Sequence, residues 1–554
     1  MVAQRRDRRE TAHGAAIESL MKAAESPARM STRDPQYDLL VVGAGINGAG
    51  IARDAAGRGL RVLIVEKGDL ASATSQWSTK LIHGGLRYLE QYEFRLVHEA
   101  LAEREVVLHQ APHIVEPLQF VLPHEPHLRP AWMLRAGLFL YDYLGKRETL
   151  PGSFGVDLAS SKWGAGLKPK FHKGFVYSDA RVDDSRLVVF NVMDAHDRGA
   201  DVRVHTRLVS AERRQESRGA SWRVTLEAPE GASEVTARVI VNASGNSVKA
   251  VRESINGFAS RENVRHVKGS HIVVPRVHDE DHAYILQNAD KRIVFVIPYQ
   301  ERYSLIGTTD IGVEAYENPR IDSAEIAYLL ELANTYLACP LDRNDIVWTY
   351  SGVRPLYDDG STDPSEITRD YVFEVDTVAS GGAPLLSIYG GKITTYRKLA
   401  EQALDHIARF LPRLKARWTD RAVLPGGDLP AGGLSAWIDE LGGRYPAFPV
   451  PLLRGLAHRH GTRALSILAG ARVPGDLGED FGQGLTEAEV AYFVHDEWAR
   501  AGDDVLWRRT KCGIGMTDAE RRRVEAFVTS CPCPTDDSRF APPEQPERKS
   551  AAGG

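Results

Sequence analysis

Short apolar runs and segments of helical spacing alternate in the first part of the chain. Residues 39–42 and 62–65 are apolar runs, and each has the length of a strand that is buried on both faces. Between them, a glycine-rich turn leads into a segment that we predict to be a helix starting near Ile46. A strand, a helix and a second strand in this order are typical of parallel sheets, so the pattern predicts an α/β domain.

The same patterns predict further elements along the chain. Helical spacing is found in residues 92–110, 184–198 and 323–338, and strand-like runs in residues 201–211, 221–227, 235–241, 271–275, 292–298, 303–307 and 384–388. Residues 425–433 are rich in Pro and Gly, and the sequence after them becomes helical in composition. Two capping-box patterns, Thr486 with Glu489 and Thr517 with Glu520, support a helical C-terminal domain.

One apolar segment leaves two interpretations open. Residues 132–144 are apolar and aromatic, and Lys146 and Arg147 follow them closely. They could form a core helix, or a helix that lies in a membrane interface with basic flanks. The chain has no run of 18 or more apolar residues, so we expect no transmembrane helix. The Arg-rich N-terminus lacks an apolar h-region, so no secretory signal is expected.

Composition narrows the class of protein only slightly. The chain is 43% hydrophobic and 26% charged, as in ordinary globular proteins. Its 554 residues are more than a single hydrophobic core usually organises, so two or three domains are expected. A net charge of −5 gives no signature of nucleic-acid binding. The four cysteines lack the spacing of metal ligands, so we predict no metal site and expect a reducing compartment.

The turn after the first strand has the sequence GAGING at 43–48, and each glycine has a physical reason. Gly43 allows the tight turn, Gly45 lets the backbone approach a pyrophosphate, and Gly48 lets the helix pack against the strand. The free N–H groups at the helix start face the phosphates. Glu66 ends the second strand 18 residues after Gly48, where a carboxylate binds a ribose hydroxyl and disfavours NADP. These residues predict a dinucleotide site.

A second glycine-rich motif, STKLIHGGLRY at 78–88, places a His, two Gly and an Arg where a flavin ring is expected. The sequence NASG at 242–245 follows a predicted strand and would bring the backbone close to the cofactor again. Together with the first motif, these residues indicate a flavoenzyme that oxidises a small, anionic substrate.

Several motifs, in this order, resemble the family of FAD-dependent glycerol-3-phosphate dehydrogenases. They are GAGINGAGIARDAAGRGL from 43, residues 78–89, KGSH at 268–271, IGTTD at 306–310, SGVRP at 351–355, GGK at 390–392 and DVLWRRT at 504–510. The resemblance covers roughly residues 36–530. A mild departure lies at 78–79, where the chain has Ser-Thr and the family pattern has Ser-Ser.

The resemblance implies an α/β (α+β) fold. Its parts are a Rossmann-like FAD-binding domain of the D-amino-acid oxidase type, an antiparallel-sheet substrate cap and a helical C-terminal domain. It implies FAD-dependent oxidation of sn-glycerol 3-phosphate to dihydroxyacetone phosphate by hydride transfer to flavin N5, with a membrane quinone as electron acceptor. Such an enzyme would be cytoplasmic, would lie peripherally on the inner face of the cell membrane, and could form a homodimer.

On this basis we predict four parts of the chain. They are a flexible tail at 1–34, an FAD-binding domain at 35–425 with an interleaved cap at about 111–182 and 266–349, a helical domain at 426–534, and a disordered tail at 535–554.

Oxidation of a secondary alcohol needs a group that accepts the hydroxyl proton, and His is the usual one near neutral pH. His83 is the first candidate and His271 the second, although either could only hydrogen-bond the cofactor or backbone. The substrate's phosphate can accept bidentate hydrogen bonds from an Arg guanidinium and can pair with the ammonium of a Lys. The candidates that bind it are Arg87, Tyr88, Arg354 and Lys392, and we count Arg354 with the catalytic residues.

The candidate FAD contacts lie on the same motifs and on the loop after the second strand. They are Gly43, Gly45, Ile46, Asn47, Gly48, Glu66, Thr74, Ser75, Lys80, Leu81, Val209, Ser244, Gly245, Gly391, Lys392, Ile393 and Thr394. Val209 is placed at the adenine by family analogy. Lys392, or the backbone N–H groups of 391–394, could stabilise reduced, anionic flavin.

Other functions stay open beside this one. A glycerol-3-phosphate oxidase that uses O2 would share the same site, and an amino-acid oxidase would share the fold. The latter would need one carboxylate-binding Arg and an apolar pocket instead of several cations. A flavin-containing sensor without turnover would need no base for a hydroxyl.

Overall fold

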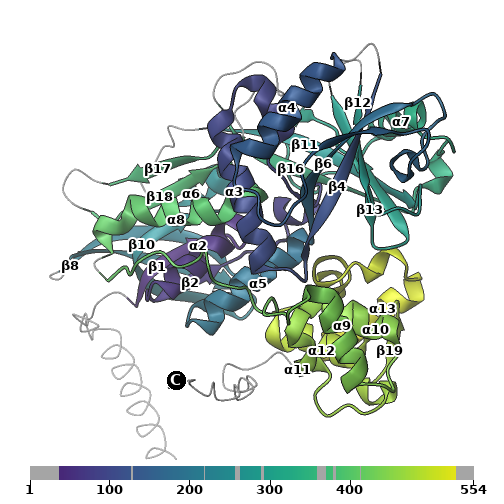
Figure 1. Ribbon diagram of the computed structural model, residues 1–554. Coiled ribbons are helices and arrows are strands. Elements are labelled where there is room, and N and C mark those ends of the chain that lie inside the picture. Colours follow the sequence, from purple (N-terminus) through teal and green to yellow (C-terminus); the bar gives the residue numbers. More distant parts are fainter. Residues whose placement is uncertain are drawn as a thin grey trace, which may run out of the picture.

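The computed structural model describes residues 36–125, 129–216, 219–255, 263–288, 292–358, 370–377, 382–411 and 413–531. Two sheets with their helices and a helical C-terminal domain lie beside one another (Figure 1). The tails predicted at 1–34 and 535–554 lie outside the described residues. The domain boundary that we propose near residue 425 falls between the helices Tyr396–Ile407 (α8) and Gly433–Arg444 (α9).

The first sheet has eight strands, and its central strands are parallel. The order is β17-β18-β10-β1-β2-β7, and β9 and β8 extend antiparallel from β10. The strands are β1 (Tyr37–Val42), β2 (Val62–Val65), β7 (Asp201–Arg203), β8 (Arg207–Glu216), β9 (Gly219–Ala228), β10 (Gly231–Asn242), β17 (Val372–Asp376) and β18 (Leu385–Tyr389). The predicted strand–helix–strand unit is confirmed.

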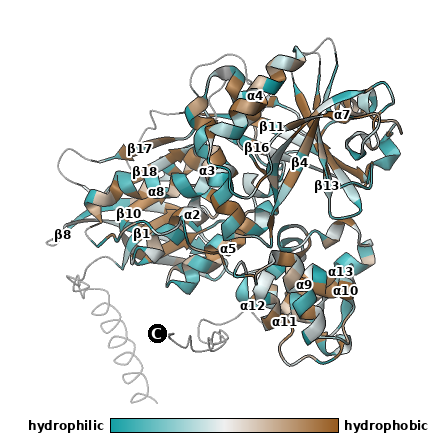
Figure 2. Cartoon of the chain, viewed as in Figure 1, coloured by the Kyte–Doolittle hydropathy of each residue, from teal (hydrophilic) through white to brown (hydrophobic). Residues whose placement is uncertain are grey.

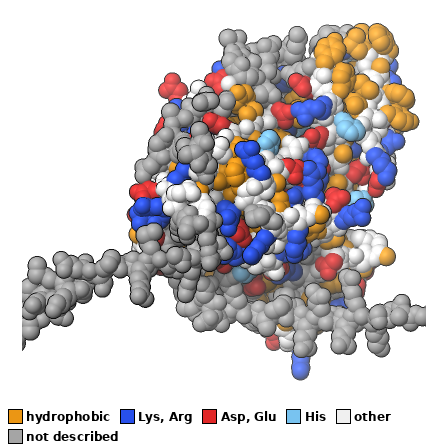
Figure 3. All heavy atoms as spheres, turned by 90° about the vertical axis from the view of Figure 1, so that its left-hand side faces the viewer, with side chains coloured by type: hydrophobic (Ala, Val, Ile, Leu, Met, Phe, Trp, Pro, Cys, Tyr) orange, Lys and Arg blue, Asp and Glu red, His pale blue; other side chains and the backbone are white. Residues whose placement is uncertain are grey.

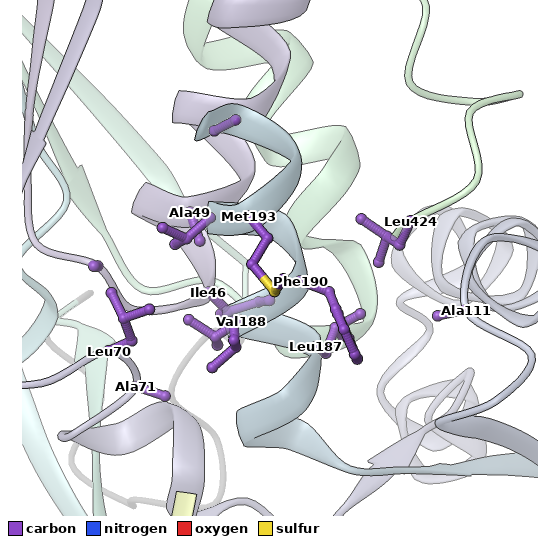
Figure 4. Packing of buried hydrophobic residues seen from close by; sticks show 14 of the residues in the cluster. Ile46, Ala49, Leu70, Ala71, Ala111, Leu187, Val188, Phe190, Met193 and Leu424 are labelled. Atoms are coloured by element: carbon purple, nitrogen blue, oxygen red, sulfur yellow. The ribbon is translucent and has the colours of Figure 1, made fainter. Parts of the chain in front are cut away.

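Helices cover the central part of this sheet, which explains why β1 and β2 are apolar runs. The helices of this part are α2 (Ile46–Gly57), α5 (Asp184–Asp197), α6 (Val248–Ser254) and α8, and α2 packs against both α5 and α8. Leu39 and Val41 of β1 belong to the core on the side of α2 and α5, part of which Figure 4 shows. Leu40 and Val42 point to a second core that includes β8 and β9. A parallel strand buried on both faces has this alternation.

The second sheet, the cap sheet, has ten strands in the order β15-β11-β14-β13-β12-β4-β6-β3, with β16 beside β11 and β5 beside β6. All its recorded pairs are antiparallel except that of β12 with β4. The strands are β3 (Leu81–Ile82), β4 (Val115–His124), β5 (Phe154–Asp157), β6 (Lys173–Val182), β11 (Val264–Pro275), β12 (Ala283–Gln287), β13 (Ile293–Tyr299), β14 (Tyr303–Gly307), β15 (Ile311–Val313) and β16 (Trp348–Tyr357). The helix α7 (Ser323–Tyr336) packs on one face, and α3 (Phe94–Gln110) and α4 (Ala131–Leu144) on the other.

The C-terminal domain is helical, as predicted. It contains α9, α10 (Val450–His460), α11 (Ala464–Ile467), α12 (Glu487–Asp496) and α13 (Asp518–Ser530), the short strands β19 (Asp480–Gly482) and β20 (Leu485–Thr486), and a π-helix, η11 (Asp504–Arg509). The capping box of Thr517 and Glu520 is complete. Thr486 caps α12, but the carboxylate of Glu489 binds Arg459 and His460 instead of returning to the cap.

The aromatic segment forms α4, and most of its large side chains face outward. Trp132 is 70% exposed and Tyr143 68%, while Leu138 and Tyr141 are buried against the cap sheet. Figure 2 shows α4 at the periphery of the molecule, with hydrophobic residues along part of its ribbon. Figure 3 shows hydrophobic side chains gathered at one upper edge of the face that it draws. The helix is therefore not a core helix. None of the helices in the described part of the chain has the length and apolar character needed to cross a bilayer.

Candidate functional site: a dinucleotide cavity between two sheets

The glycine cradle lies where the carboxyl ends of β1 and β2 meet. Gly43 has a φ of +102°, and an added Cβ would lie 2.8 Å from the carbonyl oxygen of Ala243. A Cβ on Gly48 would lie 1.8 Å from the carbonyl oxygen of Gly43. Close packing of backbone therefore requires glycine at both positions, and the turn presents its N–H groups to a ligand at the start of α2.

Glu66 joins the cradle to the loop that follows β2. Its Oε2 accepts a hydrogen bond from the N–H of Ala44 at 2.8 Å, and its Oε1 accepts one from the N–H of Gly68 at 3.0 Å. Burial raises the pKa of this carboxyl, and the two N–H groups oppose that shift. The carboxylate thus stands at the end of β2, at the position that binds a ribose hydroxyl in dinucleotide folds.

A cavity of about 630 Å³ opens at this edge and reaches the cap sheet. Its lining includes Gly43, Glu66, Thr206, Leu208, Ser244 and Asn246, and on the cap side Tyr350 and Val353. The side-chain oxygens of Asn246 and of Asn47, at the start of α2, are buried and have no hydrogen-bond partner among the described residues. Volume, cradle, carboxylate and unsatisfied amide oxygens all fit a flavin dinucleotide.

The loop after β2 ties the cradle to the cap sheet. Ser75 Oγ accepts a hydrogen bond from the N–H of Ile46 at 3.0 Å, and Thr74 Oγ1 donates one to the carbonyl of Val353 in β16 at 2.6 Å. Lys80 turns inward, and its ammonium lies 2.8 and 2.9 Å from the two carboxylate oxygens of Asp184. Leu81 is buried in β3. The side chains of Lys80 and Leu81 therefore stabilise the loop.

Among the remaining cofactor candidates, Ser244 lies in the cavity wall and the others lie on neighbouring segments. Ser244 lines it, and Gly245, with φ of +58°, begins the 3₁₀ helix η5 (Gly245–Ser247). Val209 is 40% exposed at an irregular point of β8, next to the lining residue Leu208. A Cβ on Gly391 would lie 2.9 Å from Asn47 Nδ2, so this turn approaches the start of α2 closely. Ile393 and Thr394 follow in the 3₁₀ helix η7 (Ile393–Thr395).

His271 is held rigidly between two strands. It lies in β11, 2% exposed, opposite Gly307 of β14, where a Cβ would come within 2.1 Å of the imidazole. Its ring stacks on Tyr350 at 4.6 Å between centroids, and Nε2 lies 3.1 Å from Oγ1 of Thr79. Burial and the charges of Lys80 and Arg354 keep its pKa well below the usual value, so the imidazole is neutral at pH 7.

His83 follows β3 and is less enclosed. The backbone N–H of His83 donates a hydrogen bond to Thr394 Oγ1 at 3.3 Å, and this bond joins the motif at 78–88 to the one at 390–394. Burial lowers its pKa, with Asp179 opposing and Lys392 adding to the shift. The geometry sets each candidate base near a motif that carries a candidate cation. The bond from His83 ends on Thr394, two residues after Lys392, and a Cβ on Gly269, two residues before His271 in β11, would lie 2.6 Å from Arg354 Nη2.

The candidate phosphate ligands approach from both sheets. Arg354 comes from β16, where its Nη2 lies 2.6 Å from Asp310 Oδ1 and donates to the carbonyl of Thr309 at 3.0 Å. Lys392 comes from the other side, and its Nζ lies 3.9 Å from the centroid of the Tyr88 ring. Arg87 stands beside Tyr88 in the 3₁₀ helix η3 (Leu86–Gln91) and is partly exposed.

Sequence reasoning missed a buried network behind His83. Asp179 accepts hydrogen bonds from Tyr141 at 2.8 and 2.9 Å and pairs with Arg104 at 2.6 Å, while the N–H of Gly84 donates to the Tyr141 hydroxyl at 2.9 Å. These residues fix the backbone beside the histidine. They come from β6, α4 and α3, and no local motif joins them.

Comparison with known proteins agrees with this site. Residues 38–397 match the family described as FAD dependent oxidoreductase, and residues 417–530 match the C-terminal domain of alpha-glycerophosphate oxidase. The solved glycerol-3-phosphate dehydrogenase of Bacillus halodurans, complexed with FAD, is 26% identical with a TM-score of 0.66, over 89% of this chain and 94% of that one. Fold and cavity thus define an FAD-dependent oxidoreductase, as the resemblance implied.

Relatives of higher sequence identity define the family within this class of oxidoreductases. The aerobic glycerol-3-phosphate dehydrogenase of Escherichia coli is 51% identical over 89% of this chain and 97% of the relative. The D-erythritol 1-phosphate dehydrogenase of Brucella abortus is 48% identical over 89% of this chain and 97% of its own length. The chain belongs to the family of FAD-dependent glycerol-3-phosphate dehydrogenases.

Proposed function

We propose that the protein oxidises sn-glycerol 3-phosphate to dihydroxyacetone phosphate and passes the electrons to a membrane quinone. The observation that carries the proposal is that each candidate base lies beside a segment with a candidate cation. The backbone N–H of His83 binds Thr394 in the segment of Lys392, and Arg354 approaches Gly269, two residues before His271 on β11. Burial holds the pKa of both imidazoles below the usual value. A polyol phosphate needs both a group that takes the hydroxyl proton and a charge that binds the phosphate.

FAD, when bound, would supply the acceptor for the hydride that leaves carbon 2 of the substrate. The chain supplies the rest. Arg354 and Lys392 bind phosphate oxygens and orient the alcohol, and Arg87 and Tyr88, whose ring lies against Lys392, add donors. His83 or His271 takes the hydroxyl proton, because both imidazoles are neutral at pH 7. Asp310 holds the Arg354 guanidinium in place before the substrate arrives.

The experiment is anaerobic bleaching of the flavin in the purified protein. Glycerol 3-phosphate is compared with D-erythritol 1-phosphate, glycerol and D-alanine. Rapid bleaching by glycerol 3-phosphate, much slower bleaching by the tetritol phosphate and none by the other two support the proposal. Faster bleaching by D-erythritol 1-phosphate would identify that compound as the substrate instead. No bleaching by any of the four compounds would contradict the proposed substrate. Reduction of a quinone analogue, compared with peroxide release in air, separates a dehydrogenase from an oxidase.

We also propose that α4 binds the surface of the membrane that holds the quinone. Its exposed aromatic residues support this, since such rings favour the bilayer interface. The basic flank contributes less than its sequence suggests, because Lys146 Nζ lies 2.5 Å from Glu148 and Arg147 lies 3.2 Å from Asp142. The cytoplasmic, inner-face location and a homodimer stay proposals of the same kind.

A further inference from the structure

The motif DVLWRRT at 504–510 is not explained by the catalytic site, although it belongs to the same resemblance. Most of it forms η11, a π-helix of six residues in the C-terminal domain. π-Helical turns are rare and occur often at functional sites. Two arginines of this turn, Arg508 and Arg509, leave their own domain and reach the loop that follows Glu66.

Both guanidinium groups bind the same carboxylate. Arg508 Nε lies 2.5 Å from Asp69 Oδ2, and Arg509 lies 2.5 Å from Oδ2 and 2.8 Å from Oδ1. Asp69 is 2% exposed and Arg509 is completely buried. Since charge-assisted hydrogen bonds are strong where water is excluded, the contact fixes this loop to the C-terminal domain.

The loop is part of the wall of the cofactor cavity. Glu66 Oε1 accepts a hydrogen bond from the N–H of Gly68, directly before Asp69, and the N–H of Ala71 donates to the carbonyl of Ala44 in the cradle at 3.1 Å. Arg508 itself lines the cavity. Any shift of Asp69 therefore moves the residues that surround the cofactor.

The same segment also holds the cap sheet. The Trp507 ring stacks on Trp348 of β16 with 5.1 Å between centroids and 12° between planes. Lys511 Nζ lies 3.6 Å from Asp183, at the start of α5. Residues 507–511 thus contact the loop, the cap sheet and α5 at once.

We propose that the C-terminal domain completes the FAD site, with Arg508 and Arg509 as positioning residues that hold the loop at 66–72 closed on the cofactor. FAD is then retained only while this domain is docked. The proposal depends on FAD as the cofactor and not on the identity of the substrate. Burial alone would raise the pKa of Asp69, but Arg509 and Arg508 outweigh it and lower that pKa, so the buried carboxyl is held in its charged form.

The test measures the dissociation constant of FAD by titrating apoprotein and following flavin fluorescence. Arg508→Gln is expected to raise that constant by about tenfold or more, which is the scale of one lost charge-assisted contact. The melting temperature of the apoprotein should change little, because Arg509 still binds both carboxylate oxygens of Asp69 in this variant. Arg508→Lys keeps the charge but loses the forked guanidinium. Its FAD dissociation constant should therefore lie between those of the wild type and Arg508→Gln.

The matched control is Arg463→Gln. Arg463 binds Asp197 of α5 at 2.7 Å, so it joins the same two domains away from the cavity. It should leave the FAD dissociation constant unchanged. The ion pair between Asp69 and Arg508 is then tested directly. Combining Asp69→Asn with Arg508→Gln should raise the FAD dissociation constant no more than the stronger of the two single variants does.

An unchanged dissociation constant in both Arg508 variants overturns the proposal. An equal rise of the FAD dissociation constant in Arg463→Gln also overturns it, because the general docking of the two domains would then explain the effect. If Arg508→Gln does not fold, Arg508→Lys decides the outcome by the same measurement.

Discussion

Nε2 of His271 lies 3.1 Å from Oγ1 of Thr79, so a candidate base touches the position at which the chain departs from the Ser-Ser family pattern. Tyr350 stacks on the ring, and Nδ1 is buried with no hydrogen-bond partner among the described residues. The hydroxyl at 79 therefore orients the imidazole. A serine would offer the same oxygen, so the departure keeps the hydroxyl that contacts the imidazole.

Thr79→Val should lower kcat about three- to tenfold, since it removes one neutral hydrogen bond worth about 0.5–1.5 kcal/mol. Thr79→Ser should keep near-normal kcat because it keeps the hydroxyl. Steady-state kinetics with a soluble acceptor compare the two. Equal loss in both variants would mean that the methyl group, and not the hydroxyl, matters.

Replacing each histidine separately should identify the base. Burial lowers the pKa of both imidazoles, so the neutral, proton-accepting form persists below pH 6.5 and is lost only as the pH falls through the lowered pKa. His83→Asn should cut kcat by about 10²–10⁴ and abolish the acid limb of the pH profile. His271→Asn should cut it less and keep the limb. The reverse result would assign the proton transfer to His271.

Local signals in the sequence predicted the cradle well. Gly43, Gly48 and Glu66 act within one strand–helix–strand unit, where spacing alone determines geometry. The contact between Asp69 and Arg509 joins residues that are 440 positions apart, and no periodicity records it. The network of Asp179 behind His83 was missed for the same reason.

The apolar segment that forms α4 shows a different limit. Its pattern predicts a helix, but whether another element covers its apolar face depends on tertiary packing. In the structure only Leu138 and Tyr141 of α4 are buried, while the other aromatic side chains face outward.

Arg354→Ala should raise the KM for glycerol 3-phosphate by an amount that corresponds to about 2–5 kcal/mol, because one charge-assisted contact with the substrate's phosphate is lost. FAD should stay bound, which the flavin absorbance of the purified variant shows. Arg265→Ala is a suitable control, since Arg265 of β11 pairs with Asp358 at 3.0 Å in the same sheet. An unchanged KM would remove Arg354 from the substrate site.

Membrane binding should depend on the aromatic face of α4 rather than on its basic flank. The rings of Phe139 and Tyr143 lie 4.6 Å apart and are 56% and 68% exposed. Each contributes up to about 1.5–3 kcal/mol when it enters an apolar phase, so replacing both with Ser should lower partitioning into vesicles at least tenfold. Co-sedimentation with liposomes measures this, with Val473→Ser, an exposed apolar residue of the C-terminal domain, as control. Replacing Lys146 and Glu148 together with Gln removes this ion pair without changing the net charge, and should change partitioning little. Wild-type co-sedimentation of the double variant would exclude α4 as the membrane-binding element.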